Sequence, residues 1–172
     1  MDDQLATVPA VMAGAPAGPQ GHTAQAIQCG AWSLALSFDW ANTIVDQFEL
    51  VTIPKSPHWL IGAVNLEGGI VPVVDLAAYV DPTGETTTID RRHRLLVGGR
   101  TEGSNEDAVA ILFSGLPFQI QYTREPVSTD VAMPERLRDL CRGAARSGTG
   151  QLHLEIDTPR FVENLALSLM EI

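Results

Sequence analysis

The stretch that decides the fold is residues 57–76, which read PHWLIGAVNLEGGIVPVVDL. It holds two apolar runs, Leu60 to Leu66 and Ile70 to Leu76, on either side of Glu67-Gly68-Gly69. Short runs that are rich in Val, Ile and Leu are typical of β-strands. The Gly-Gly pair supplies the positive φ angles that a tight turn requires. The stretch therefore predicts an antiparallel hairpin with its tip at these glycines.

Short strands are also predicted on both sides of this hairpin. Trp32, Leu34, Leu36 and Phe38 alternate with smaller residues, which predicts a half-buried strand with one inner face. Further strands are expected at 43–53, 93–97, 108–113, 118–122, 126–131 and 151–157. The polar segment 98–107 is expected to be a long hairpin loop. A string of roughly eight to ten short strands with few helices favours small antiparallel barrels.

Three helices are predicted between and after the strands. Asp75 can cap a short helix that runs through Val80. Residues 134–146 have helical spacing, with Pro134 in the first turn. Thr158 is a natural N-cap, and the apolar residues after it recur at four-residue steps, which predicts an amphipathic closing helix.

The composition fits one globular domain with a tail in front of it. The chain has 172 residues, of which 45% are hydrophobic and 19% are charged. Residues 1–23 are rich in Ala, Pro and Gly and are expected to form a mobile tail, with the domain at 24–172. The sequence contains no apolar run long enough for a membrane span and has Asp2 and Asp3 where a signal peptide would be basic. These features predict a cytoplasmic protein.

The formal net charge of −10 excludes some partners. Such a charge repels nucleic acid and anionic membrane surfaces. It permits docking on basic protein surfaces, although a solvated acidic surface is the commoner explanation for such a charge. Cys29 and Cys141 stand far apart in the sequence, which favours reduced thiols over a disulfide framework.

The stretch 57–76 also resembles the core signature of CheW-like domains, the adaptor modules of bacterial chemosensory arrays. That family shows the pattern Pro-x-x-x-x-Gly-x-x-Asn-Leu-Arg-Gly-x-x-Val-Pro-Val-x-Asp-Leu. The matching positions are Pro57, Gly62, Asn65, Leu66, Gly68, Val71, Pro72, Val73, Asp75 and Leu76. Two departures stand out: Glu67 replaces the arginine of the pattern, and residues 113–116 read Phe-Ser-Gly-Leu where many relatives show Val-Asp-x-Val.

The resemblance implies a fold and a function. The fold is mainly β, with two small five-stranded β-barrels packed together and a C-terminal helix. The function is that of a non-catalytic adaptor without a cofactor. One barrel surface pairs with the regulatory domain of a CheA-type histidine kinase, and a groove between the barrels receives the cytoplasmic tip of a chemoreceptor. The pathway can be a flagellar one or a type IV pilus chemosensory one.

Several residues are candidates for partner contacts. Within the signature they are Asn65, Glu67, Gly68 and Gly69, of which Glu67 is expected to face solvent with no packing role. Trp59 is expected to be partly exposed at a barrel end, where aromatic side chains anchor protein contacts. The predicted helix at 134–146 would carry Arg138, Arg142 and Arg146 along one stripe, which is a plausible contact face.

The alternative function is a small-ligand or enzymatic module on a double barrel. His153, Glu155 and Asp157 would share one face of a strand and could hold a divalent ion, although a solvated strand face explains them too. Arg91, Arg92 and Arg94 flank His93 and could bind phosphate or an acidic partner, or serve solubility. This function requires the polar groups to converge on a concave, partly apolar pocket.

Overall fold

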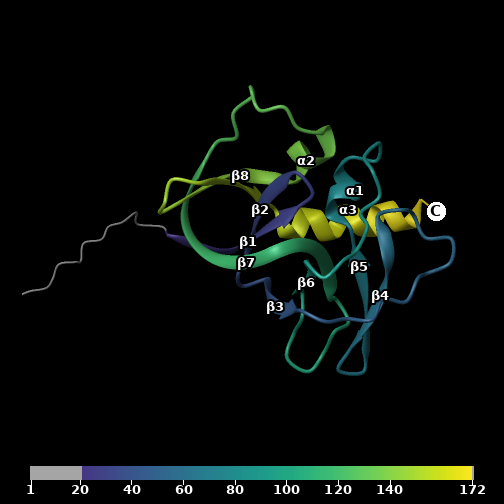
Figure 1. The fold of residues 1–172 in the computed structure, drawn as a ribbon. Coiled ribbons are helices and arrows are strands. Elements are labelled where there is room, and N and C mark those ends of the chain that lie inside the picture. The colour runs from purple at the N-terminus through teal and green to yellow at the C-terminus, as the bar shows by residue number, and fades with distance from the viewer. Residues whose placement is uncertain (1–20, 172) are drawn as a thin grey trace, which may run out of the picture.

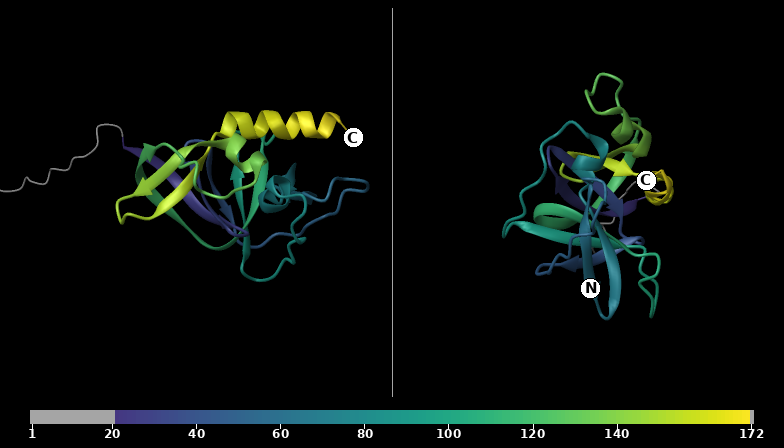
Figure 2. Two further views of the ribbon diagram at one scale, coloured as in Figure 1. Left: turned by 90° about the horizontal axis from the view of Figure 1, so that it is seen from above. Right: turned by 90° about the vertical axis from the view of Figure 1, so that its right-hand side faces the viewer.

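The structure is a computed structural model that describes residues 21–171. Nine strands and three helices are found in this part of the chain (Figures 1 and 2). In chain order they are β1 (His22–Cys29), β2 (Trp32–Ser37), β3 (Ala41–Val45), β4 (Leu60–Leu66), β5 (Gly69–Val74), α1 (Leu76–Val80), β6 (His93–Gly98), β7 (Val109–Glu125), α2 (Glu135–Leu140), β8 (Cys141–Ser147), β9 (Leu152–Ile156) and α3 (Thr158–Met170). None of the helices at 21–171 is long and apolar enough to cross a membrane.

Five of the strands form a ring, here called the closed barrel. The pairing runs β1-β2-β9-β8-β7, and β7 pairs back to β1. All contacts in the ring are antiparallel except that between β2 and β9, which is parallel. Because the ring closes, one face of each strand points into the barrel, and Figure 1 shows the ring of strands on the side of β8 and β1.

The other strands form a second, less complete barrel, here called the open barrel. Its order is β3-β6-β7-β5-β4, and β3 and β4 are not paired with each other. The segment between them contributes Val51, which forms an isolated bridge with Ala63 of β4. The expected fold of two five-stranded barrels with a C-terminal helix is therefore confirmed.

Strand β7 belongs to both barrels. Its first residues pair with β6 as far as Ser114, and its later residues pair with β8 from Tyr122 onward. Gly115 lies between these parts with a φ of 80°, a conformation that favours glycine. The two strands predicted at 108–113 and 118–122 are thus one 17-residue strand.

The core lies in three places. The largest cluster fills the space between the barrels and includes Leu34, Leu36, Phe113 and Phe161. The open barrel is filled mainly by Val and Leu side chains. The lumen of the closed barrel is lined by Ala24, Ala26, Ala35, Ala145, Ile120 and Tyr122. Alanines suit this lumen because a five-stranded barrel is narrow.

Strand β2 is buried on both faces, which the sequence pattern did not indicate. Leu34 and Leu36 pack between the barrels, and Ala35 on the opposite face is 0% exposed in the lumen. Val64, Val71, Val73 and Ile111, from the other apolar strands, are also buried. Trp32, Phe38, Leu66 and Leu154 are only half-buried.

Several predicted elements were wrong. Strand β3 ends at Val45, so the strand expected at 43–53 stops early, and 126–131 forms no strand. Helix α2 ends at Leu140, and the rest of the predicted helix is strand β8. The reason is that β8 pairs with both β7 and β9 to complete the ring, and this tertiary pairing overrides local helix preference.

The two termini of the domain also differ in detail from expectation. His22 and Thr23, the last residues of the predicted tail, belong to β1, and residues 1–20 of that tail lie outside the described residues. Helix α3 is capped by Asp157, whose side chain accepts a hydrogen bond from the backbone of Arg160, and Thr158 is its first residue.

The predicted cap of helix α1 at Asp75 is confirmed, because the Asp75 side chain accepts a hydrogen bond from Ala78 N.

Candidate partner-binding surface

The tip of the β4–β5 hairpin is a two-residue turn. Leu66 pairs with Gly69, so Glu67 and Gly68 form the turn, with φ angles of 53° and 86°. Positive φ at both residues is typical of a type I′ turn. The prediction that Gly68 and Gly69 supply these angles was wrong at Gly69, since Glu67 adopts one of them. Asn65 stabilises the turn, because its Oδ1 accepts a hydrogen bond of 3.0 Å from Gly68 N.

Side chains from the β6–β7 loop hold this tip in place. Arg100 Nη2 donates to Glu67 Oε2 at 2.6 Å, and Arg100 Nε donates to Asn105 Oδ1 at 2.8 Å. Asn105 Nδ2 in turn donates to the carbonyl of Leu66 at 2.7 Å. The expectation that Glu67 has no packing role was therefore wrong, although its side chain remains 76% exposed.

Gly69 is needed for this contact between the hairpin and the loop. A Cβ on Gly69 would lie 2.8 Å from Asn105 Nδ2, too close for an ordinary contact. A Cβ on Gly68 would meet nothing within 4 Å, so that glycine serves the turn conformation instead. Sequence reasoning missed Arg100 and Asn105. One available signal was that Arg100 is the only basic residue in the acidic segment 98–107.

Trp59 does not have the exposed position that was expected. It is only 5% exposed, and its ring packs edge-on against Tyr79 with 5.1 Å between the centroids. Its backbone carbonyl also accepts a hydrogen bond from Asp75 N at 2.8 Å. One edge of Trp59 lines an apolar groove of about 300 Å³ between helix α3 and strand β5. Trp59 is thus a core residue rather than an exposed anchor.

The predicted arginine stripe does not exist. Arg138 lies on α2, and its Nη2 donates to the carbonyl of Val131 at 2.6 Å. Arg142 and Arg146 lie on strand β8, where Arg146 pairs with Glu125 at 2.8 Å. The spacing that aligns these residues on a helix separates them once the chain becomes a strand after Leu140.

The candidate metal ligands on β9 are buried and do not converge. His153 is 2% exposed and Glu155 is 4% exposed, so the interpretation of a solvated strand face was wrong for both. Glu155 pairs with Arg124, whereas the carboxylate of Asp157 caps helix α3. Among residues 21–171 no group of three or more His, Cys, Asp or Glu side chains is placed to hold a metal ion.

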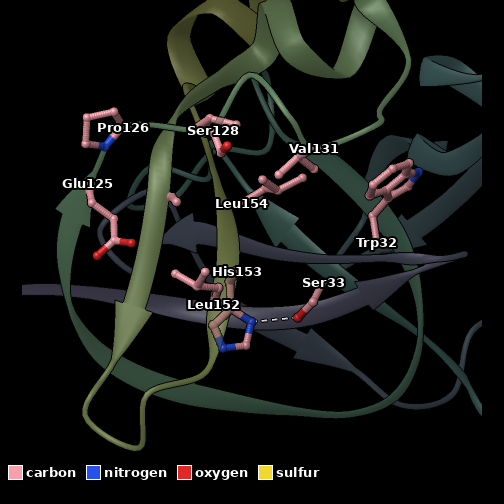
Figure 3. Close-up of a pocket in the computed structure, with 11 residues that line it drawn as sticks. Trp32, Ser33, Glu125, Pro126, Ser128, Val131, Leu152, His153 and Leu154 are labelled. Atoms are coloured by element: carbon pink, nitrogen blue, oxygen red, sulfur yellow. Dashed lines mark hydrogen bonds between the residues drawn. The ribbon is translucent and has the colours of Figure 1, made fainter.

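His153 lies at the edge of an apolar pocket of about 280 Å³ (Figure 3). Strands β2 and β9 pair only at Leu34 and Ala35 of β2. The residues that precede these pairs in both strands line the pocket. A hydrogen bond of 2.6 Å between Ser33 Oγ and His153 Nδ1 spans the gap. Burial lowers the pKa of His153, which favours the neutral ring.

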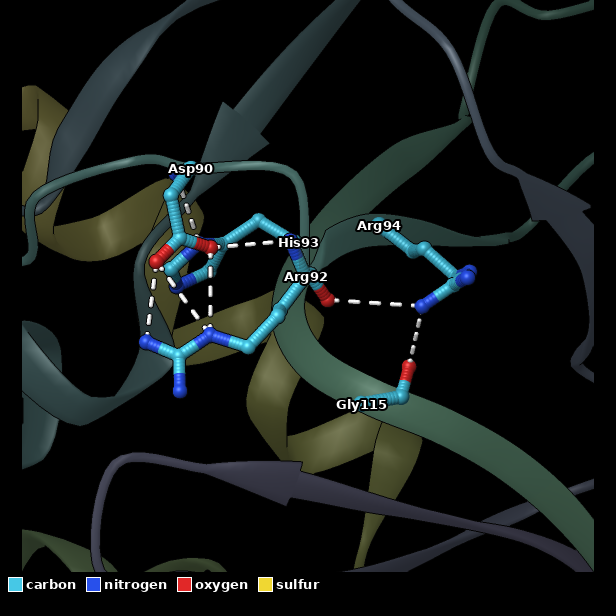
Figure 4. Close-up of polar contacts among 5 residues, drawn as sticks. All are labelled: Asp90, Arg92, His93, Arg94 and Gly115. Carbon is cyan, nitrogen blue, oxygen red and sulfur yellow. Dashed lines mark hydrogen bonds and ion pairs between the residues drawn. The ribbon is translucent and has the colours of Figure 1, made fainter.

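The basic cluster near β6 is engaged with nearby acidic groups and carbonyls (Figure 4). Arg92 forms an ion pair of 2.8 Å with Asp90, and its hydrogen bonds lower the pKa of Asp90 to about 2. Arg94 donates to Asp46 at 2.9 Å and to the carbonyl of Gly115 at 2.7 Å. His93 Nδ1 lies 3.1 Å from Asp90 Oδ1. These contacts engage several of the donors by which Arg92 and Arg94 would bind a phosphate.

Comparison with known proteins agrees with this architecture. The family model described as CheW-like domain matches residues 26–166. A curated relative, the chemotaxis protein CheW of Thermotoga maritima, is 42% identical over 45 residues, which cover 25% of this chain and 30% of that protein. The chain therefore matches less than a third of the length of this relative.

A solved structure extends the likeness to the whole fold. The scaffolding protein TtCheW from Thermoanaerobacter tengcongensis superposes with a TM-score of 0.64 over 80% of this chain and 90% of its own. The sequence identity of 16% means that this likeness concerns the fold alone. The family match covers strands of both barrels and reaches into helix α3. The chain belongs to the CheW-like domain family.

Proposed function

We propose that this chain is a non-catalytic adaptor that couples chemoreceptors to a CheA-type histidine kinase. The observation that carries the proposal is the CheW-like match over residues 26–166, because it includes strands of both barrels. The curated relative is named a chemotaxis protein and the solved neighbour a scaffolding protein, which supports the same role. The output of such a protein is the placement of its partners.

The hairpin-tip surface, made of Asn65, Glu67, Gly68, Gly69 and the neighbouring Ile70, is the proposed contact with the kinase. Ile70 is 69% exposed, and large exposed aliphatic side chains at a rigid turn suit a protein interface. The turn is also fixed by contacts with the β6–β7 loop, so little conformational entropy is lost when a partner binds. The tip of a chemoreceptor is proposed to bind between the barrels.

The proposal places the protein in the cytoplasm, at receptor arrays on the inner face of the membrane. The same coupling would serve a flagellar pathway or a type IV pilus chemosensory pathway that controls twitching motility. The identity of the copurifying receptors and kinase distinguishes these pathways.

Affinity purification of the full chain from its native cells tests the proposal. We expect a CheA-type kinase and methyl-accepting chemoreceptors to be enriched together, as read by mass spectrometry. A Glu85→Arg variant is the control for charge reversal outside the hairpin-tip surface, since Glu85 is an exposed acidic residue in the loop after α1. This variant should enrich the same partners as wild type. If neither partner is enriched with folded wild-type protein, the adaptor function is wrong.

A further inference from the structure

We propose that Arg100 is a positioning residue for the hairpin-tip surface, and that this surface presents the carboxylate of Glu67 to a basic side chain on a partner protein. The inference rests on the proposed function, because it assumes that the hairpin tip contacts the kinase. It adds a residue from outside the signature stretch and a chemical class for the group that the partner contributes.

The first step is the geometry of Arg100. Its guanidinium donates through Nη2 to Glu67 and through Nε to Asn105, so two acceptors on different segments fix the orientation of one planar group. The side chain is only 27% exposed, and Asn105 is itself anchored to the carbonyl of Leu66. Arg100 therefore cannot turn away without breaking contacts on both sides.

The second step is the effect on Glu67. An exposed glutamate at a turn would otherwise sample many rotamers, and the hydrogen bond from Arg100 holds one carboxylate oxygen, Oε2. The side chain is still 76% exposed, so Oε1 remains available to a partner. A side chain that is ordered before binding loses less conformational entropy in the complex.

The third step is the sign of the charge. Arg100 is the only basic residue in the segment 98–107, and it is already paired with Glu67. The same segment carries Glu102, Glu106 and Asp107, all exposed. The hairpin tip and the loop that holds it therefore carry more acidic than basic side chains, which favours a basic side chain on the partner over an acidic one. Ile70 beside the turn offers an apolar contact to the same partner.

A double-mutant cycle on the full chain tests the inference. Binding of the purified CheA-type kinase is measured for wild type, Glu67→Gln, Arg100→Gln and the double variant. We expect each single variant to weaken binding about threefold to fivefold, and the double variant to be no weaker than either single one. Arg92→Gln is the matched control, because Arg92 forms an exposed ion pair with Asp90 on a different segment, and its binding should equal that of wild type.

A charge swap separates positioning from a merely structural role. The variant Glu67→Arg with Arg100→Glu can re-form the ion pair but not the hydrogen bond to Asn105 Oδ1, so its thermal stability should lie above that of Glu67→Arg alone and no higher than that of wild type. Its kinase affinity should still fall, because the exposed group now has the wrong sign. Full recovery of affinity by the swap, independent effects of the two single variants, or unchanged binding by Arg100→Gln would overturn the inference. Failure of wild type itself to bind any CheA-type kinase would instead contradict the proposed function.

Discussion

Arg124 holds the carboxylate of Glu155 through two hydrogen bonds of 2.7 Å, from Nε to Oε2 and from Nη2 to Oε1. The Glu155 side chain is only 5% exposed, while that of Arg124 is 35% exposed. Burial acts to raise the pKa of Glu155, but hydrogen bonds from Arg124 and Tyr122 outweigh it, so the pKa lies below its ordinary value. The pair joins strands β7 and β9 across the closed barrel.

Replacing Arg124 with methionine should destabilise the protein by about 3 kcal/mol at neutral pH, because Glu155 would keep a buried charge without its cationic partner. Urea unfolding at pH 7 measures this cost. Arg146→Met is the control, since its ion pair with Glu125 is exposed and should matter little. Equal stability of the two variants would show that the buried pair has no special role.

The same pair predicts a pH dependence with a definite sign. A carboxylate with a lowered folded-state pKa contributes stability that is fully present above its unfolded pKa, about 4.3. That contribution is lost as the pH falls through the folded-state value. The gap in stability between wild type and Arg124→Met should therefore narrow in acid. A gap that stays constant down to about pH 3 would contradict the assignment.

The hydrogen bond between Ser33 and His153 gives a second prediction in the same barrel. Ser33→Ala should lower the free energy of unfolding by about 1–3 kcal/mol, since it leaves the buried Nδ1 of His153 without a partner.

Because the pKa of His153 is lowered by burial, the neutral ring is the stable form in the folded protein. Stability should thus be complete above about pH 6.5 and decrease below it as the unfolded state takes up a proton. Urea unfolding of wild type and His153→Gln tests this, because the variant should lose that part of the pH dependence.

Local signals predicted some of these elements well. The hairpin at 57–76, the capped helix α1 and the amphipathic helix α3 each depend on residues that are close in sequence, such as Asp75 and the Ala78 amide that it caps. The alternation of β9 was also visible, with His153 and Glu155 on one face. The alternation of residue types along a strand cannot show, however, whether its polar face points into a barrel or into solvent. Both arrangements give the same period of two residues. Only ring closure shows that the face with His153 and Glu155 points inward.

The features that the sequence could not predict depend on contacts between distant segments. Helix α2 gives way to β8 because partner strands lie on both sides of residues 141–147. Arg100 reaches Glu67 although 33 positions separate them. A periodic pattern in the sequence does not indicate which distant residues will be in contact. The ion pair between Glu67 and Arg100 is therefore seen only in the folded chain.

Because Trp59 is buried, its replacement should lower the stability of the fold, whereas replacement of an exposed interface anchor would act on partner binding. Trp59→Ala should lower the free energy of unfolding by about 3–5 kcal/mol, because it removes a large core side chain that packs on Tyr79. Leu116→Ala is the comparison, since Leu116 is 74% exposed and its truncation should change stability by less than about 0.5 kcal/mol. Chemical unfolding followed by circular dichroism measures both. A Trp59→Ala variant as stable as Leu116→Ala would mean that the tryptophan is not part of the core.

Glu67→Arg reverses the charge of the hairpin tip, and its effect should appear in binding rather than in folding. The side chain is 76% exposed and the turn is set by Gly68 and Asn65, so the variant should fold normally even though Arg100 loses its ion pair.

Binding of the kinase to Glu67→Arg should weaken mainly through a slower association rate, because a charge at the rim of an interface acts while the two proteins approach each other. Titration at ionic strengths of about 0.1 M and about 1 M separates this effect from a steric one, since the Debye length falls from about 10 Å to about 3 Å. The loss should be large at the lower ionic strength and small at the higher one. Equal binding of wild type and Glu67→Arg at both would place the kinase contact away from this hairpin.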